Sequence, residues 1–221
     1  APYDWDDNLL VGAWQSVTYH VDANRFPEII REKVAIPHGV NHIHGHISDI
    51  KKDDDGYITS VVTEEGEEFE ADLFLDCTGF ARVLTKTMDV EWIPMPEITT
   101  TSLVVAPIKY KDVTKEFRPY TMSNAMDEGW LFVIPLYNRM GSGYVYDSSE
   151  ISKEDAMKKY KKYWEGYEFI QEPAHMSWDA GKYKTQWNKN VVAVGLSSGF
   201  LEPLESTSIH LVTTALLRLM K

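Results

Sequence analysis

The residues best suited to chemistry lie together at positions 199–210. This stretch reads Gly-Phe-Leu-Glu-Pro-Leu-Glu-Ser-Thr-Ser-Ile-His, with two carboxylates and three hydroxyls inside seven consecutive residues. A helix is predicted to begin among the hydroxyls, and its first turn would offer unpaired N–H groups and about half a positive charge. A halide or a developing oxyanion would fit there. The structural alternative is that Ser206, Thr207 or Ser208 only caps the helix, with Glu205 completing the cap.

Two apolar segments that end in small residues are predicted to position that stretch. Residues 71–79 end in Thr78-Gly79, and residues 190–196 end in Gly195-Leu196. Short, continuous apolar segments are typical of strands buried on both faces. In open α/β sheets, ligands bind beyond the carboxyl ends of such strands, where small residues leave the backbone accessible. Each end alone is more often an ordinary turn, but two in one chain would suit a large cofactor.

The other elements of this first sheet come from the start and the end of the chain. Residues 22–35 repeat apolar side chains at the period of a helix, and Gly39 follows as a stop signal. Asp-Gly and Glu-Gly pairs then mark two tight turns between β-prone segments, which predicts a three-stranded meander. The predicted strands of the meander cover residues 40–50, 57–63 and 67–70. A last helix is predicted over residues 206–220.

A second, antiparallel sheet is predicted in the middle of the chain. Residues 99–108 and 130–146 are rich in β-branched and aromatic side chains, which favour strands. Turns are predicted at residues 138–139 and 141–143, and an amphipathic helix over residues 153–165. The fold class is therefore predicted to be α/β, with a mixed sheet plus an antiparallel sheet.

Composition argues against several classes of partner. The chain has 34 acidic and 22 basic residues, a formal charge of −12, which would repel nucleic acid and anionic membrane surfaces. No apolar stretch reaches the ~20 residues needed to cross a bilayer. Cys77 is the lone cysteine, which excludes an internal disulfide and favours a reducing compartment, so we predict a cytoplasmic protein. The chain starts without methionine and stops within a predicted helix, so we expect further N- and C-terminal parts.

Three histidines, His42, His44 and His46, alternate along a predicted strand. That spacing can bind zinc, but no fourth ligand follows at a suitable distance. We therefore interpret the three as a polar strand face and predict no metal site.

Five segments match a known family in order and spacing: residues 18–23, 73–79, 129–135, 141–146 and 195–209. They resemble the flavin-dependent tryptophan halogenases. The segment that holds Phe200, Pro203, Glu205 and Ser206 is specific to these halogenases, whereas a buried strand ending in Thr78-Gly79 also occurs in aromatic-hydroxylating flavoproteins. The chain is thus identified as the central, FAD- and halide-binding part of a member of this family.

The resemblance implies a fold, a division of the chain and a reaction. The fold would be the FAD-dependent hydroxylase-like (GR2-type) fold, with an FAD-binding core of residues 1–80 and 187–221 and a substrate-side part of residues 81–186. Reduced FAD, dioxygen and chloride or bromide would give hypohalous acid. The acid would pass through a tunnel to an electron-rich aromatic substrate, such as an indole, tryptophan or a phenol. A separate flavin reductase would be a partner, and a homodimer is possible.

Roles for individual residues follow from the matched motifs. Glu205 and Ser206 would be catalytic, and the halide would lie against Thr207 and Ser208. The resemblance assigns FAD contacts to Ile47, Thr78, Gly79, Gly195, Leu196 and Ile209. It assigns the substrate or tunnel side to Trp130, Phe132, Pro135 and Phe200.

Departures from the family pattern leave alternatives open. Phe132 stands where the family has a second tryptophan, and Ser208 where many relatives have glycine. The chain contains neither the glycine-rich phosphate-binding loop nor a lysine in the family's catalytic context, and both are expected upstream of Ala1. The alternatives are an aromatic flavin monooxygenase, which halide-dependent product would distinguish from a halogenase, and a non-catalytic flavin-binding fragment.

Overall fold

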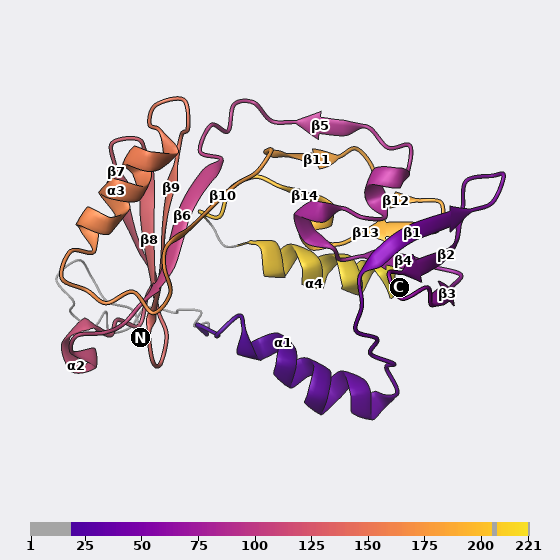
Figure 1. The fold of residues 1–221 in the computed structure, drawn as a ribbon, viewed down its shortest axis with the longest axis horizontal. Coiled ribbons are helices and arrows are strands. Elements are labelled where there is room, and N and C mark those ends of the chain that lie inside the picture. Colours follow the sequence, from indigo (N-terminus) through magenta and orange to yellow (C-terminus); the bar gives the residue numbers. More distant parts are fainter. Residues whose placement is uncertain (1–18, 205–206, 221) are drawn as a thin grey trace, which may run out of the picture. The chain divides into compact units, whose positions relative to one another are not determined.

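The computed structural model describes residues 19–204 and 207–220 (Figure 1). Backbone contacts group the chain into two compact units, residues 1–42 with 102–176 and residues 43–101 with 177–221. This grouping concerns packing alone, so the predicted functional division into residues 1–80 with 187–221 and residues 81–186 stays a prediction.

The first unit contains the predicted antiparallel sheet. Its strand order is β10-β6-β9-β8-β7. Buried side chains alternate along β8, and helix α3 covers the sheet through Ala156, Tyr160 and Trp164 (Figure 1). The Ser152 side chain accepts a hydrogen bond from the Asp155 N–H and so caps α3. The elements are β6 (Ser102–Ile108), β7 (Met122–Met126), β8 (Gly129–Pro135), β9 (Met140–Tyr146), β10 (Ala174–Ser177), α2 (Val113–Glu116) and α3 (Lys153–Tyr163).

The predicted turn at residues 141–143 is wrong, because these residues lie inside β9. Gly143 pairs with Phe132 of β8 and with Val105 of β6. A Cβ at position 143 would overlap the Phe132 ring and lie 2.7 Å from Leu103 Cδ1. The glycine therefore makes room for side chains that cross the strand, and it does not mark a turn.

The predicted N-terminal helix is confirmed within the first unit. It runs as α1 (Arg25–Ile30), then as a π-helical segment η1 (Arg31–Ala35), and closes with a 3-10 turn η2 (Ile36–His38). Gly39 follows in the left-handed conformation, with φ 89°. That conformation suits glycine and ends the helix.

The meander of the second unit is confirmed, with a later start than expected. It consists of β1 (Ile47–Lys52), β2 (Ile58–Thr63) and β3 (Glu68–Glu70) in that order. Ile47 pairs with Thr63, the last residue of β2, so residues 40–46 have no partner strand. His42, His44 and His46 thus lie in an exposed segment without regular structure, and their interpretation as a strand face is wrong. Within the described residues, no cluster of three or more potential metal ligands forms.

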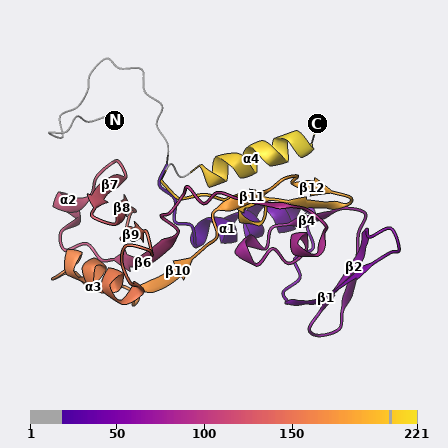
Figure 2. The same cartoon turned by 90° about the horizontal axis from the view of Figure 1, so that it is seen from above.

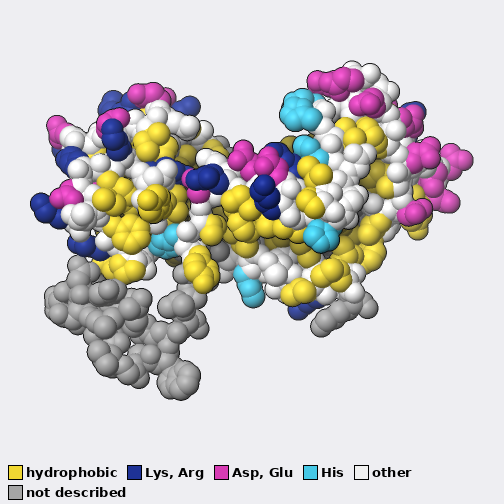
Figure 3. Space-filling model, turned by 90° about the horizontal axis from the view of Figure 1, so that it is seen from below, with side chains coloured by type: hydrophobic (Ala, Val, Ile, Leu, Met, Phe, Trp, Pro, Cys, Tyr) yellow, Lys and Arg dark blue, Asp and Glu magenta, His cyan; other side chains and the backbone are white. Residues whose placement is uncertain are grey.

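The surface of the meander is acidic. Asp53, Asp54 and Asp55 are exposed at its first turn, and Glu64, Glu65 and Glu67 are exposed at its second. Figure 3 shows acidic side chains gathered over this part of the molecule. This distribution agrees with the argument from net charge against a nucleic-acid partner.

Two three-stranded sheets complete the second unit. In the order β12-β13-β4, β12 runs antiparallel to β13, whereas β13 runs parallel to β4, so the sheet is mixed as predicted. The second sheet has the order β14-β11-β5. The elements are β4 (Phe74–Asp76), β5 (Trp92–Pro94), β11 (Gly181–Tyr183), β12 (Trp187–Asn188), β13 (Val191–Ala193), β14 (Gly199–Phe200) and α4 (Ser208–Leu219).

Burial of the parallel pair differs from the prediction in one strand. All three residues of β13 are buried, as expected. In β4, however, Leu75 is 43% exposed, so this strand is buried on one face only in the described part of the chain. Figure 2 shows α4 on one side of this sheet and the β1–β2 hairpin on the other. None of the helices in the described ranges has the length and apolarity needed to cross a bilayer.

Candidate functional site

The two predicted small-residue ends meet at one edge of the mixed sheet. Ala193 of β13 pairs with Asp76 of β4, so the parallel strands end side by side. The chain continues from β4 into the 3-10 turn η3 (Gly79–Ala81) and from β13 into η5 (Gly195–Ser197), and these turns contact each other. Gly79 and Gly195 both have left-handed φ angles, 65° and 68°. Both chains therefore turn sharply at the sheet edge, where glycine allows it.

Asp76 ties these turns together. It is fully buried, and its carboxylate accepts hydrogen bonds from the N–H and hydroxyl groups of Thr78 and of Thr85, from the Leu84 N–H, and from the Ser197 hydroxyl. The distances lie between 2.6 and 3.2 Å. One carboxylate thus fixes the ends of both strands.

The network keeps Asp76 ionised. Burial alone would raise the pKa of this carboxyl, but the hydrogen bonds from Thr78 and Thr85 together outweigh it and hold the pKa below its ordinary value. An ionised carboxylate accepts hydrogen bonds but donates none, which matches the six donors around it.

A cavity of about 580 Å³ opens beside these turns, within the second unit. Its walls come from η5, β11, β14, the segment after β14 and one face of α4. Five residues predicted as site residues line it: Gly195, Leu196, Phe200, Thr207 and Ser208. The volume lies within the range of small-molecule and cofactor sites, roughly 300–1,000 Å³.

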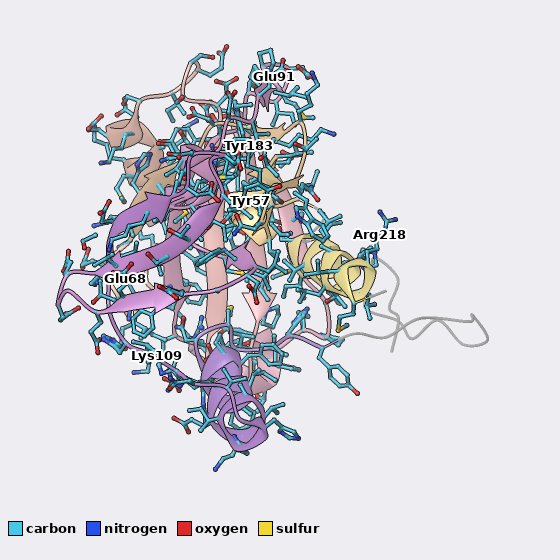
Figure 4. The ribbon with its side chains drawn as sticks, turned by 90° about the vertical axis from the view of Figure 1, so that its right-hand side faces the viewer. Tyr57, Glu68, Glu91, Lys109, Tyr183 and Arg218 are labelled. Atoms are coloured by element: carbon cyan, nitrogen blue, oxygen red, sulfur yellow. The ribbon has the colours of Figure 1, made fainter. Side chains whose placement is uncertain are left out.

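The charges around the cavity are mixed. Lys182 and Arg218 are the cationic side chains among its lining residues, and Glu202 is the anionic one. Figure 4 shows Arg218 projecting outward from α4. The Glu202 carboxylate accepts a hydrogen bond from the Thr100 hydroxyl at 2.9 Å.

The N-terminus of α4 faces this cavity. Thr207 is the N-cap residue, and its side chain makes no capping hydrogen bond, so a hydroxyl cap from Thr207 is not formed. Thr207 and Ser208 both line the cavity, where the helix dipole favours an anion. Glu205 and Ser206, the predicted catalytic residues, lie outside the described residues.

The remaining predicted FAD contacts are distributed over the second unit. Thr78 and Gly79 lie at the end of β4, beside η5. Ile47 begins β1 and Ile209 lies in the first turn of α4, where it is 68% exposed. Neither isoleucine lines the cavity in the described structure.

The predicted substrate-side residues lie on different elements. Trp130, Phe132 and Pro135 belong to β8 of the first unit, and Phe200 to β14 of the second. Trp130 and Phe132 share one face of the sheet, with ring centroids 5.9 Å apart, while Pro135 is buried on the other face. Within the described residues, the buried Trp130 indole N–H has no hydrogen-bond acceptor.

Trp178 is a functional candidate that sequence analysis missed. Phe200 packs edge-on against both Phe80 and Trp178, with centroid distances of 5.6 and 5.3 Å. The Trp178 indole N–H donates to the Leu201 carbonyl at 2.7 Å. No local pattern around residue 178 marks this contact, because its partners are 22 or more positions away in the sequence.

Comparison with known proteins identifies the family. The family model described as tryptophan halogenase matches residues 10–221. Tryptophan 7-halogenase RebH of Lentzea aerocolonigenes is 33% identical over 205 residues, which are 92% of this chain and 39% of that protein. The chain thus spans about two fifths of the length of such relatives.

Solved structures agree with the sequence match. Xcc4156, a flavin-dependent halogenase from Xanthomonas campestris, aligns with a TM-score of 0.85 and 32% identity over 91% of this chain and 40% of its own. BrvH, a flavin-dependent halogenase from Brevundimonas sp. BAL3, aligns with the same TM-score and identity over 91% of this chain and 41% of its own. The chain belongs to the tryptophan halogenase family.

Proposed function

We propose that this chain is the flavin- and halide-binding part of a flavin-dependent halogenase that acts on an electron-rich aromatic compound. The carrying observation is the meeting of the β4 and β13 ends beside a cavity that Thr207 and Ser208 also line. Family membership adds support, since the relatives named above are halogenases.

The residues present fit the ring portion of a flavin. Gly79 has open space where a Cβ would stand, and at Gly195 a Cβ would lie 3.3 Å from Val212 Cγ2. Neither position carries a side chain, and Gly195 lines the cavity, so backbone there can approach a flat ligand. Thr78, Gly79, Gly195 and Leu196 would hold the flavin, together with Ile47 and Ile209. With dioxygen, bound reduced FAD would supply the oxidation that converts chloride or bromide to hypohalous acid.

The chain's own residues would hold the halide and assist the halogenating species. Chloride or bromide would lie against the backbone of Thr207 and Ser208, where the N-terminus of α4 supplies partial positive charge. Glu205 would supply the acid that activates the halogenating species, with Ser206 beside it. Trp130, Phe132, Pro135 and Phe200 would form the substrate or tunnel side.

Partners follow from the same proposal. The substrate would be a small aromatic molecule of the indole, tryptophan or phenol class, and a separate reductase would supply reduced flavin. A homodimer and a cytoplasmic location are part of the proposal; the lone Cys77 supports the location.

The test uses the complete protein that contains this chain, with reduced flavin, dioxygen, bromide and a panel of indoles and phenols. Brominated product is expected by mass spectrometry. Glu205→Gln should lower its rate at least about a hundredfold while flavin binding stays unchanged. Glu67→Gln, an exposed carboxylate on the meander, is the matched control and should have no effect.

Other outcomes would replace the proposal. Hydroxylated product formed without halide would favour an aromatic flavin monooxygenase. Flavin binding without any product would favour a non-catalytic flavin-binding protein. Failure to bind flavin would contradict the proposed cofactor itself.

A further inference from the structure

Three contacts hold the segment that enters residues 203–208. The Leu201 carbonyl accepts from the Trp178 indole N–H at 2.7 Å, and the Glu202 carboxylate accepts from the Thr100 hydroxyl at 2.9 Å. The Phe200 ring packs against the rings of Phe80 and Trp178. Three successive residues are thus held by side chains from other segments of the same unit.

The two hydrogen-bond donors are themselves joined. The Trp178 backbone N–H donates to the Thr101 carbonyl at 3.0 Å, next to Thr100. Trp178 is buried, so its ring and its indole N–H are held in place. Thr100, Thr101 and Trp178 therefore form one anchor, which we call the Trp178 anchor.

We propose that Trp178 and Thr100 are positioning residues, which fix residues 200–202 and so help to set the halide seat at Thr207 and Ser208. This inference rests on the proposed function. Pro203 comes directly after the anchored residues, and its ring fixes one backbone torsion and restricts Glu202 as well. Pro203 therefore restricts the backbone directly after the anchored residues.

Trp187 makes a hydrogen bond of the same type to a neighbour in sequence, so it provides the control. Its indole N–H also donates to a backbone carbonyl, that of Lys189, at 2.8 Å. That partner is two residues away, and Trp187 is 55% exposed. Trp187→Phe therefore removes the same type of hydrogen bond from the same unit without touching residues 200–202.

The experiment compares four variants of the complete, flavin-loaded protein: Trp178→Phe, Thr100→Val, Thr100→Ser and Trp187→Phe. Trp178→Phe and Thr100→Val each remove a donor, whereas Thr100→Ser keeps the hydroxyl. Amide hydrogen exchange of residues 199–208, the KM for bromide, and the fraction of consumed dioxygen that yields brominated product are measured.

Trp178→Phe and Thr100→Val should speed exchange in residues 199–208, raise the bromide KM about tenfold and lower the product fraction. The rate of flavin oxidation should stay unchanged. Thr100→Ser and Trp187→Phe should behave like the original protein. A purely structural role would lower the melting temperature without this selective loss of halide use.

Unchanged exchange in residues 199–208, or a Thr100→Ser protein as defective as Thr100→Val, would overturn the anchor. If Trp178→Phe fails to fold, the comparison of Thr100→Val with Thr100→Ser tests the anchor by the same measurements. If the original protein forms no halogenated product, the proposed function fails, and hydrogen exchange still decides whether the anchor orders residues 199–208.

Discussion

The antiparallel sheet of the first unit and the paired strand ends of the second are held together by different forces. Val104, Ile108, Leu131 and Tyr144 are fully buried in one apolar cluster beneath α3. The paired ends instead centre on Asp76, a buried carboxylate with hydrogen-bond donors from three turns. Apolar packing stabilises the first region, whereas the second combines an apolar cluster that includes Phe74, Leu84 and Val191 with a buried polar centre.

This difference follows from what each region must do. An apolar cluster close-packs and leaves no room beside it. Under the proposed function, these turns leave backbone accessible to the ligand, and Asp76 holds them from the buried side. A buried carboxylate whose oxygens accept hydrogen bonds from such turns fixes them in place and leaves the cavity open.

The largest predicted effect breaks the polar centre. Asp76→Ala should lower the free energy of unfolding by about 4 kcal/mol or more, because buried donors of Thr78, Thr85 and Ser197 lose their acceptor. Urea unfolding of the complete protein measures this change. Asp76→Asn keeps one acceptor oxygen and should lose roughly half as much. A loss below about 1 kcal/mol for Asp76→Ala would mean that packing alone holds the turns.

The pH dependence provides a control for this prediction. The pKa of Asp76 in the folded protein lies below its ordinary value, so its carboxylate stabilises the fold fully above the unfolded pKa of about 3.9. This stabilisation is lost as the pH falls from about 4 through the folded pKa. The stability difference between the original protein and Asp76→Asn should therefore be constant above about pH 5 and shrink below 4. A difference that grew on acidification would reverse the assigned sign.

The next effect concerns the apolar region. Gly143→Ala should cost about 2 kcal/mol, because the new methyl group would overlap the Phe132 ring. Gly141→Ala is the matched control two residues away, where a Cβ would meet nothing closer than 3.8 Å. Both variants share the effect of replacing glycine on the unfolded chain. The difference between their free energies of unfolding, measured with denaturant, therefore reports the crowding at position 143. Equal costs at the two positions would contradict the crowding at Gly143.

The two regions also differ in how much of their structure can be predicted from the sequence. The apolar pattern of residues 190–196 predicts a buried strand, and β13 confirms it, because such a pattern depends on the strand's own side chains. The glycines of residues 141–143 predict a turn, yet they lie inside β9. Only the pairing register reveals that Phe132 crosses Gly143.

The contacts of the second unit were out of reach of local patterns. Asp76 meets Thr85 nine positions away and Ser197 121 positions away, and nothing in the intervening sequence specifies those pairs. Leu75 was expected to be buried because it is apolar, yet sequence cannot say which part of a chain covers a given face. Long-range polar pairs and the cover of a strand are properties of the assembled fold.

The smallest effect tests whether a polar group matters within the apolar cluster. The Tyr160 hydroxyl donates to the Ser142 carbonyl at 3.1 Å, and burial raises the pKa of Tyr160 to about 12. Tyr160→Phe should cost about 1 kcal/mol, the net value of one hydrogen bond. Tyr163→Phe, on the exposed side of α3, should cost about nothing. In urea unfolding, the Tyr160→Phe deficit should hold below pH 10, where tyrosine in the unfolded chain stays protonated, and should shrink and then reverse sign as the pH rises toward 12. A deficit much larger than about 1 kcal/mol would show that the first unit also depends on a polar centre, and the two regions would then differ less in what stabilises them.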